Sequence, residues 1–470
     1  MLRLFELDDD KFHEECGVFG VFNQKNASEL VYYGLHALQH RGQEGCGIVV
    51  NNEGKFQHHK GLGLVQEVFN EKILDSLEGS SSIGHVRYST AGGNNLENTQ
   101  PFVFHGNSNA FAMCHNGNIV NANVIKEDLE KTGSIFHSSS DSEIIAHLIR
   151  KENSDDIITD LKNALKKLQG AFAFLYMNND KIYAMRDKWG LRPLSIAKLE
   201  NGYVISSETC AFDLVGAEYI RDIAPGEIVE ISKFGINSYQ YDVPDMYLCA
   251  MEFIYFSRPD TNIESTNVHA TRKRAGKLLA KNYGIDADIV VGVPDSSISA
   301  AIGYAEESGV PYEMGLIKNK YVGRTFIQPS QELREKGVKL KLSAVKSLVE
   351  NKRVVMVDDS IVRGTTSKKI VEMLKQAGAK EVHVRIASPK IIAPCFYGVD
   401  TSTYEELIAA KISKEELCDR IGASSLEFLS CSEIKDAIKS VSSSKCGLCL
   451  ACFNKNYPTK IYDSLENANK

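Results

Sequence analysis

Apolar and polar positions divide the chain into two halves with different periodicities. Before about residue 244, short runs rich in β-branched and aromatic residues are bounded by Gly, Asn, Asp or Ser, as is typical of strands joined by turns. Two helical stretches interrupt these strands, at 27–40 and at 142–168, the second broken into 142–150 and 157–168. The pattern predicts an α+β domain in which two sheets are faced by helices. The expected strands are CGVFGVF, GCGIVV, SSIGHVRYS, NAFAMCHNG, GAFAFLYM, KIYAMRD and GYVISSE.

After residue 244 the pattern changes to helices that alternate with nearly continuous Val/Ile runs. Such strands are typical of a parallel sheet with helices on both faces, so we expect a doubly wound α/β domain. The polar stretch 318–343 is expected to be a functional or mobile loop, because loops of that length are uncommon in compact domains. The expected helices are 267–283, 296–308 and 366–377, and the expected strands are 287–293, 352–357 and 381–388.

The composition narrows the class of protein. A chain of 470 residues, 43% hydrophobic and 24% charged, is long enough for two or three globular domains. The 54 basic and 61 acidic residues give a net charge of −7, which argues against a general nucleic-acid binder. No apolar run approaches the ~18 residues of a membrane span, and the acidic N-terminus does not resemble an export signal. We therefore expect a soluble cytoplasmic protein whose cysteines are thiols, metal ligands or nucleophiles.

The segment RVVMVDDSIVRGTTS at 353–367 contains the strongest chemical motif. A buried strand places Asp358 and Asp359 at its carboxyl end, where open α/β sheets bind ligands. The hydroxyl-rich turn that follows is suited to an anion, because backbone N–H groups at a helix start bind phosphate. Two acids beside a phosphate site fit a sugar phosphate, whose hydroxyls the acids would hold. The alternative is that the acids only cap the helix.

This segment resembles the signature of type I phosphoribosyltransferases, which bind phosphoribosyl pyrophosphate (PRPP). The resemblance implies that Asp358 and Asp359 hold the ribose hydroxyls and that a second loop, VGVPDSS at 291–297, holds the pyrophosphate. Magnesium, one ion per subunit, is expected to arrive with PRPP and to contact Ser296 and the two acids. The stretch from 318 resembles the flexible loop that folds over PRPP in that family; a solvated charged loop is the alternative. The other implied PRPP-binding residues are Ser360, Arg363, Gly364, Thr365 and Thr366 of the turn, Asp295, Ser296 and Ser297 of the second loop, and Lys318, Lys320, Tyr321, Arg324 and Thr325 of the flexible loop.

Motifs in the first half supply the groups that a glutaminase needs. Cys16 in EECGVFGVF, at the front of a strand, is a candidate nucleophile, although a Cys before Gly is more often a core residue. If Cys16 became N-terminal, its own α-amine, with a pKa near ~7.7–8.0, could act as the base. The other groups are candidates for an oxyanion hole and for amino-acid binding: Asn116 and Gly117 in HNGN, Arg87 and Thr90 in GHVRYSTAGG, and Asp141 in SDSE.

In this order the motifs resemble class II glutamine amidotransferases, which are N-terminal nucleophile hydrolases with an αββα sandwich. HRGQEGCGI, with Arg41 and Gly42, matches the loop that faces the nucleophile in that family. Fifteen residues precede Cys16, and longer members of the family remove such a propeptide, so we expect 1–15 to be cleaved. The implied roles are Cys16 as nucleophile, Asn116 and Gly117 as the oxyanion hole, and Arg41, Arg87, Thr90, Gly117 and Asp141 for binding glutamine.

Both halves together resemble the glutamine PRPP amidotransferases, and the likeness includes YFSRPD at 255–260 between the halves. We expect a propeptide at 1–15, an amidotransferase domain at 16–244 and a phosphoribosyltransferase domain at 245–470. The implied reaction is the first committed step of purine synthesis, in which ammonia from glutamine displaces pyrophosphate from PRPP to give 5-phosphoribosylamine. The family also implies a homotetramer inhibited by AMP, GMP, ADP or GDP, with Tyr255 and Phe256 as candidates for the wall of an ammonia passage.

Three cysteines in CGLCLAC, at 446, 449 and 452, have the spacing of metal ligands but lack a local fourth ligand. The cluster-bearing branch of the resembled family uses four cysteines, two of them far upstream. This implies one structural [4Fe–4S] cluster per subunit, held by Cys249, Cys395, Cys449 and Cys452. The alternatives are zinc in place of iron, Cys446 in place of a distal ligand, and thiols without metal.

Two other functions compete with this interpretation. Another class II amidotransferase, such as a hexosamine-phosphate synthase, would have no use for the ribose-binding acids of DDSIVRGTTS. A PRPP-sensing regulator that binds DNA would have no reason to combine Cys16, Arg87 and Asn116, and a net charge of −7 is unsuited to DNA. Glutamate release measured with and without PRPP separates the three functions.

Overall fold

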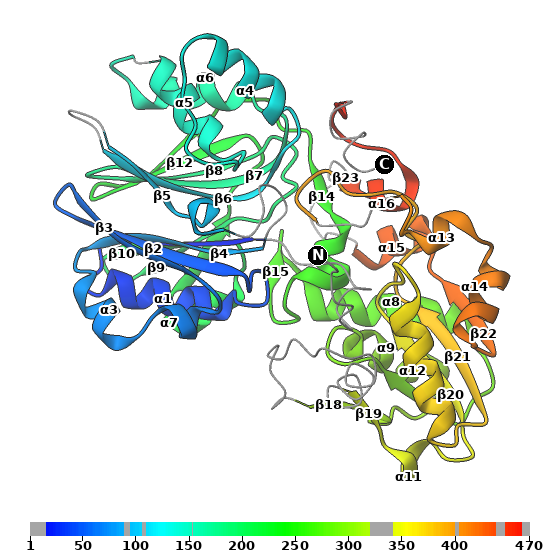
Figure 1. Cartoon of the computed structure of the whole chain (residues 1–470). Helices are drawn as coiled ribbons and strands as arrows, with labels where there is room; N and C mark the ends of the chain where they lie inside the picture. The colour runs from blue at the N-terminus through cyan, green and yellow to red at the C-terminus, as the bar shows by residue number, and fades with distance from the viewer. Residues whose placement is uncertain are drawn as a thin grey trace.

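The computed structural model describes residues 16–88, 95–105, 110–152, 154–319, 342–399, 404–438 and 447–462. Figure 1 shows two lobes, one built from each half of the chain. Among the described helices, none is both long and apolar enough to cross a membrane. Several predicted features lie outside the described residues: the propeptide 1–15, Thr90, Lys320, Tyr321, Arg324, Thr325 and Cys446.

Seven antiparallel strands form the first sheet of the N-terminal lobe, in the order β11-β9-β10-β1-β4-β2-β3. A buried cluster that includes Phe19, Val31 and Leu35 joins helix α1 (Ala27–Ala37) to the outer face of this sheet (Figure 1). The strands are β1 (Gly17–Phe22), β2 (Gly45–Asn52), β3 (Lys55–Leu62), β4 (Ser81–Arg87), β9 (Ser195–Leu199), β10 (Gly202–Ser206) and β11 (Glu218–Asp222). The other helices on this side are α2 (Val65–Val68), α3 (Glu71–Ser76) and α7 (Cys210–Val215).

Six antiparallel strands form the second sheet, in the order β13-β12-β8-β7-β6-β5. Buried side chains such as Val18, Cys114 and Ala173 fill the space between the two sheets, so the lobe has four layers. The strands are β5 (Phe102–Phe104), β6 (Phe111–Ile119), β7 (Gly170–Met177), β8 (Ile182–Arg186), β12 (Glu227–Ser232) and β13 (Gly235–Gln240). The helices on the outer face are α4 (Ala122–Lys131), α5 (Glu143–Glu152) and α6 (Ile157–Lys166) (Figure 1).

Four parallel strands, in the order β17-β20-β21-β22, form the sheet of the C-terminal lobe. One face packs on a cluster that includes Val355 and Leu279, and the other on a cluster that includes Met356 and Ile370. The strands are β17 (Ile289–Gly292), β20 (Arg353–Asp358), β21 (Glu381–Ile386) and β22 (Ser425–Phe428). The helices are α8 (Val268–Tyr283), α9 (Ile298–Ser308), α11 (Lys346–Val349), α12 (Thr365–Gln376), α13 (Ile408–Lys411), α14 (Lys414–Ile421) and α15 (Cys431–Ile438).

Three short strand pairs complete this lobe. β14 (Tyr247–Cys249) pairs in parallel with β23 (Gly447–Cys449), which is followed by helix α16 (Ala451–Asn454). β18 (Leu316–Lys318) pairs with β19 (Leu342–Ala344), so the two ends of the predicted flexible loop lie side by side. The third pair is β15 (Asn262–Ile263) with β16 (Thr266–Asn267).

The predicted fold class, an αββα sandwich followed by a doubly wound parallel sheet, is confirmed. All seven strand runs quoted from the first half are strands: β1, β2, β4, β6, β7, β8 and β10. Helix α4 was not predicted: its apolar stripe of Ala122, Ile125 and Leu129 is narrow, and only Leu129 is fully buried. Helix bounds differ by up to three residues; α1, for example, ends at Ala37 and not at His40.

Candidate active sites

Cys16 lies immediately before β1, partly exposed, with its Sγ 3.5 Å from the carbonyl oxygen of Tyr88. Its own carbonyl oxygen accepts a hydrogen bond of 3.1 Å from Nε of Arg41. Arg87 ends β4, and because Val86 is paired with Gly17, Arg87 lies beside Cys16 at the same edge of the sheet. The candidate nucleophile is thus fixed through its backbone while its thiol can be reached.

Asn116 and Gly117 lie next to each other on β6 in the second sheet. The buried Asn116 donates from Nδ2 to Oγ of Ser207 at 3.4 Å, and this oxygen also accepts from the Val18 amide at 3.0 Å. Gly117 has a φ of +137°, and a Cβ atom there would stand 2.0 Å from the Ala171 carbonyl oxygen. Only glycine fits this position, so the direction of its amide is set by the backbone.

Asp141 lies just before α5 and points its carboxylate toward β6. Its Oδ2 accepts from the Ile119 amide at 2.9 Å, and its Oδ1 is 3.7 Å from Nδ1 of His115. Burial alone would raise the pKa of Asp141, but the His115 ring, the Ile119 amide and the Ser142 hydroxyl together hold it below its ordinary value. The carboxylate is therefore an anion at neutral pH, suited to an ammonium group.

Arg41 was predicted to bind glutamine, and the structure places its buried guanidinium behind Cys16, between two carboxylates. Nη1 is 2.7 Å from Oε1 of Glu208, and Nη2 is 2.8 Å from Oε1 of Glu252. Burial alone would raise the pKa of Glu208, but His40 and Arg41 hold it below its ordinary value. Neither acid could be recognised from its neighbours in the chain, because a buried Glu that pairs with a distant residue looks like any surface Glu.

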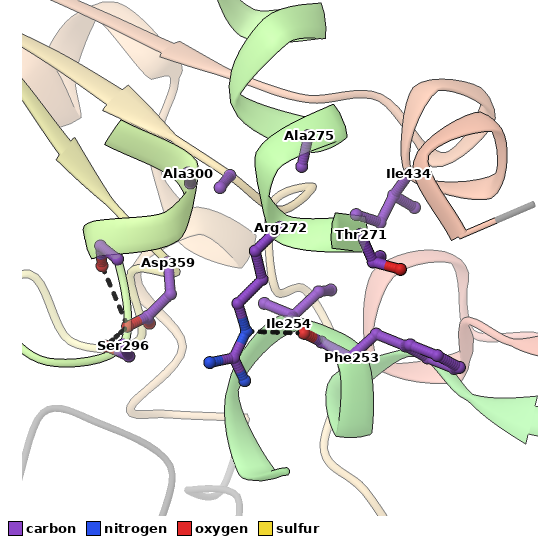
Figure 2. Close-up of a pocket in the computed structure, with 11 residues that line it drawn as sticks. Phe253, Ile254, Thr271, Arg272, Ala275, Ser296, Ala300, Asp359 and Ile434 are labelled. Atoms are coloured by element: carbon purple, nitrogen blue, oxygen red, sulfur yellow. Dashed lines mark hydrogen bonds between the residues drawn. The ribbon is translucent and has the colours of Figure 1, made fainter. Parts of the chain in front are cut away.

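Asp358 and Asp359 lie at the carboxyl end of β20, both buried, facing the loop that follows β17. Oδ1 of Asp358 accepts from Oγ of Ser297 at 2.9 Å, and Asp359 accepts from the hydroxyl of Ser296 (Figure 2). Oγ of Ser360 donates to Oδ1 of Asp359 at 2.6 Å. The two loops that the sequence assigned to ribose and pyrophosphate therefore meet at one edge of the sheet, as the switch-point rule expects.

The turn between Ser360 and Thr366 leads directly into α12. Gly364 and Thr366 are buried, whereas Thr365 is exposed at the helix start, where unpaired backbone amides favour an anion. Arg363 pairs with Glu406, Nη2 to Oε2, at 2.8 Å. Elsewhere at this edge Nζ of Lys318 lies 3.0 Å from Oδ2 of Asp295, and both side chains are exposed.

A cavity with about 280 Å³ of empty space lies between Asp359, with Ser296 and Ser297, and a π-helical turn, η3 (Glu252–Phe256). Arg272 of α8 lines it and donates to the carbonyl oxygen of Phe253 at 2.8 Å (Figure 2) and to that of Tyr255 at 2.9 Å. Burial lowers the pKa of Arg272 to about 10, although Asp359 opposes this shift. Tyr255 and Phe256, the candidates for a passage wall, both belong to η3, with ring centroids 5.5 Å apart.

Four cysteines line a second cavity with about 390 Å³ of empty space: Cys249, Cys395, Cys449 and Cys452. The β14–β23 pairing sets Cys249 opposite Cys449. Burial, with Cys395 nearby, raises the pKa of Cys449 to about 12, and burial beside the other three thiols raises the pKa of Cys452 well above its ordinary value. Within the described residues, no group of three His, Cys, Asp or Glu converges on a single ion position.

Comparison with known proteins finds relatives that match nearly the whole chain. Two family models match the chain, a glutamine amidotransferase domain over 85–213 and a phosphoribosyl transferase domain over 262–389. An amidophosphoribosyltransferase of Bacillus subtilis (strain 168) is 56% identical over 453 residues, 96% of this chain and 95% of the relative. The chain belongs to the amidophosphoribosyltransferase family. The amidophosphoribosyltransferase of Staphylococcus aureus (strain Mu50) is 51% identical over 96% of this chain and 92% of the relative.

Solved structures of amidophosphoribosyltransferases share the whole fold. The B. subtilis glutamine PRPP amidotransferase complexed with ADP and GMP superposes with a TM-score of 0.91 at 55% identity, covering 95% of this chain and 98% of that chain. A structure described as the allosteric regulatory enzyme of purine biosynthesis gives a TM-score of 0.92 at 55% identity, over 95% and 97% of the two chains. The chain is therefore an enzyme of the first step of purine biosynthesis, with an amidotransferase and a phosphoribosyltransferase part, as the motifs predicted. The two competing functions are excluded.

Proposed function

We propose that glutamine is hydrolysed at Cys16 and that the released ammonia is used at the Asp358–Thr366 turn to make 5-phosphoribosylamine. The observation that carries the proposal is the meeting of two acids with two serines at the end of β20: Asp358 with Ser297, and Asp359 with Ser296. Carboxylates that accept hydrogen bonds from serine hydroxyls in this structure are placed to accept them from the ribose hydroxyls of PRPP.

In the glutaminase half-reaction, the α-amine of Cys16 takes the thiol proton once residues 1–15 have been removed. The thiolate attacks the amide carbon of glutamine, and Nδ2 of Asn116 and the Gly117 amide stabilise the oxyanion. The α-ammonium then gives its proton to the departing nitrogen, ammonia leaves, and water hydrolyses the thioester to glutamate. Arg87 and Thr90 would hold the substrate carboxylate, and the anionic Asp141 its ammonium group.

In the second half-reaction, ammonia attacks C1 of PRPP and pyrophosphate leaves, without a protein nucleophile. Asp358 and Asp359 would hold the ribose hydroxyls. Their buried oxygens, with that of Ser296, are hard donors that fit magnesium, which when bound neutralises charge on the pyrophosphate. The remaining contacts follow the predicted roles: Ser360, Arg363, Gly364, Thr365 and Thr366 for the phosphate, Asp295, Ser296 and Ser297 for the pyrophosphate, and Lys318, Lys320, Tyr321, Arg324 and Thr325 for the covering loop.

The cavity between the lobes fits a [4Fe–4S] cluster held by Cys249, Cys395, Cys449 and Cys452. Four thiols that line one common space are the donor set that such a cluster takes. The cluster would join β14, the 395–399 turn and the β23–α16 segment, so its role is structural. Because burial raises the thiol pKa values, loading the cluster must release protons.

We further propose a boundary between the two domains at residues 244–245, because β14 already pairs with β23 of the C-terminal part. The homotetramer, the cytoplasmic location and inhibition by AMP, GMP, ADP or GDP belong to the same proposal. The related B. subtilis structure holds ADP and GMP, which supports nucleotide binding. Light scattering and the effect of each nucleotide on the apparent KM for PRPP test these points.

Glutamate release and 5-phosphoribosylamine formation, each measured with and without PRPP, test the main proposal. The Cys16→Ala variant should release no glutamate yet retain synthesis from ammonium, because the PRPP site lies in the other lobe. Cys431→Ala, which changes a partly buried thiol of α15, is the control and should retain both activities. Glutamine-dependent synthesis by Cys16→Ala would contradict the proposal.

A further inference from the structure

We infer that Glu252 positions Cys16, so that the nucleophile of one lobe is held by a carboxylate of the other. The inference rests on the proposed role of Cys16. Glu252 begins η3 and is buried. Its Oε1 accepts from Nη2 of Arg41 at 2.8 Å, and its Oε2 accepts from Nη1 at 3.0 Å. A two-point pair between planar groups fixes the orientation of the guanidinium as well as its position.

The orientation of Arg41 matters because its third nitrogen holds the nucleophile. Nε donates to the carbonyl oxygen of Cys16, while Nη1 also reaches Glu208 of the same lobe at 2.7 Å. If the charge of Glu252 is removed, Glu208 remains as the dominant anion on one side of the guanidinium. The guanidinium is then expected to turn toward Glu208, which draws Nε away from Cys16. A displacement of this kind at a reacting group is costly to the rate and not to substrate affinity.

The carboxylate itself is held firmly in place. Ser257 donates from Oγ to Oε2 of Glu252 at 2.7 Å, and the Ser257 amide donates to the Glu252 carbonyl oxygen at 3.1 Å, the i to i+5 bond of a π-helical turn. Arg192 of the N-terminal lobe lies 3.4 Å from Oε1. Arg272 holds the far side of the turn: it donates to the carbonyl oxygen of Phe253 (Figure 2) and to those of Tyr255 and Ser257, at 2.8–2.9 Å. Single-turn π-helices often mark functional positions.

A reciprocal contact ties the other end of this segment to the nucleophile's lobe. Glu208 accepts from the Arg258 amide at 2.9 Å and from the Thr261 hydroxyl at 2.7 Å. Each lobe therefore contributes one buried glutamate to Arg41 and the environment of Cys16. The glutaminase site is complete only when the 252–261 segment of the C-terminal lobe is docked.

The test compares two glutamates that pair with a buried arginine across the same boundary. Glu252→Gln is the test variant, and Glu264→Gln is the control, because Glu264 pairs with Arg186 at 2.7 Å and does not touch Arg41. Glutaminase kcat, the KM for glutamine, the rate of Cys16 alkylation by iodoacetamide and ammonia-dependent synthesis are measured on iron-replete protein. We expect Glu252→Gln to lower kcat and the alkylation rate about 10- to 100-fold, with the KM and ammonia-dependent synthesis within about twofold. Glu264→Gln should leave all four unchanged.

Two further variants keep the inference falsifiable if Glu252→Gln does not fold. Ser257→Ala retains the charge but frees one carboxylate oxygen, and should lower kcat and alkylation about two- to fivefold. Glu252→Asp should recover part of the rate lost in Glu252→Gln. Suppose that Glu252→Gln or Ser257→Ala keeps a normal glutaminase kcat and a normal alkylation rate, while Cys16→Ala is inactive. This result would overturn the inference about Glu252 and leave the proposed function standing. Parallel loss of ammonia-dependent synthesis would also overturn it, whereas glutamate release by Cys16→Ala would overturn the proposed function instead.

Discussion

Gly398 lies directly against Gly117: a Cβ atom on Gly398 would stand 3.0 Å from the carbonyl carbon of Gly117. Nearby, Asn118 donates from Nδ2 to the carbonyl oxygen of Phe396 at 2.9 Å. The turn that follows Cys395 therefore packs on the strand that carries the proposed oxyanion hole. The same turn supplies Cys395, Tyr397 and Val399 to the lining of the cysteine cavity, so it links that cavity to the proposed oxyanion hole.

The first prediction concerns this contact. Gly398→Ala should lower the glutaminase kcat tenfold or more, because the added methyl group displaces the Gly117 amide, and loss of one oxyanion donor costs about 10²–10³ in rate. Gly422→Ala is the control, since Gly422 also has a positive φ, +73°, but nothing lies within 4 Å of its Cβ position. Both variants bear backbone strain of about 1–2 kcal/mol, and only Gly398→Ala should lose activity. Equal kcat values would show that the contact does not reach the oxyanion hole.

Asp359→Asn should raise the KM for PRPP about 10- to 150-fold while glutamine hydrolysis without PRPP continues. Hydrogen bonds to a charged group contribute about 1.5–3 kcal/mol, and an amide presents only one acceptor where Ser296 and Ser360 now donate to two oxygens. The control is Asp286→Asn, which removes an exposed carboxylate paired with Arg353. Unchanged PRPP affinity in Asp359→Asn would mean that the acids cap a helix.

Protein purified without oxygen should be brown and contain about four irons per chain. Cys449→Ser should lose the iron and most of the folded protein, because the remaining thiols would line a cavity without a core. Cys446→Ser should retain iron, as should the control Cys418→Ser, whose thiol faces the Ala423 carbonyl oxygen. Colourless protein with stoichiometric zinc would contradict the cluster, and iron loss in Cys446→Ser would contradict the ligand set.

The active enzyme should begin at Cys16, without Met1–Glu15. While Glu15 is attached, the nitrogen of Cys16 is an amide and cannot accept a proton, so a folded precursor should have no glutaminase activity. Mass spectrometry of the N-terminus, combined with both activity assays, checks this. Full glutaminase activity in protein that retains Met1–Glu15 would refute the role of the α-amine.

Stability should fall as the pH drops below about 6.5, partly because of His85. Burial, and secondly the charge of Arg87, lowers the pKa of His85 to about 3. Between pH values of about 3 and 6.5, His85 binds a proton in the unfolded chain but not in the folded chain. The stability that the neutral His85 contributes is therefore complete above pH 6.5 and declines as the pH falls below it. Each pH unit in this window costs about 1.4 kcal/mol.

Urea unfolding at pH 6.5 and 5.5 measures this effect. The free energy of unfolding should fall by about 1 kcal/mol more in the wild type than in His85→Gln, because the substitution removes the titrating ring. His36→Gln is the control, since His36 is exposed on α1. Identical pH dependence of the wild type and His85→Gln would contradict the assignment.

Local chemistry explains why much of both sites could be predicted. Asp358 and Asp359 follow a buried Val/Met run and precede a hydroxyl-rich turn, and strand, acids and turn are contiguous in the sequence. Glu252 could not be predicted in this way, because its partner Arg41 lies 211 residues away. Such a pair depends on how two lobes dock, which hydrophobic periodicity does not encode. Helix α4 was missed for a different reason, since its apolar stripe of Ala122, Ile125 and Leu129 is narrow and only Leu129 is fully buried.

The pairing of β14 with β23 has a consequence for the order of biosynthesis. Cys249 and Cys449 are neighbours in space, yet 200 residues separate them in the chain, so a ribosome must translate the whole catalytic sheet before the second strand exists. A nascent chain that has produced only Cys16 and the amidotransferase sandwich, up to β13, still lacks all four cavity cysteines and the strand that supports β14, three residues before Glu252. A chain that ends before β23 therefore cannot pair β14 or complete the four-cysteine cavity, whatever the state of its N-terminal sandwich.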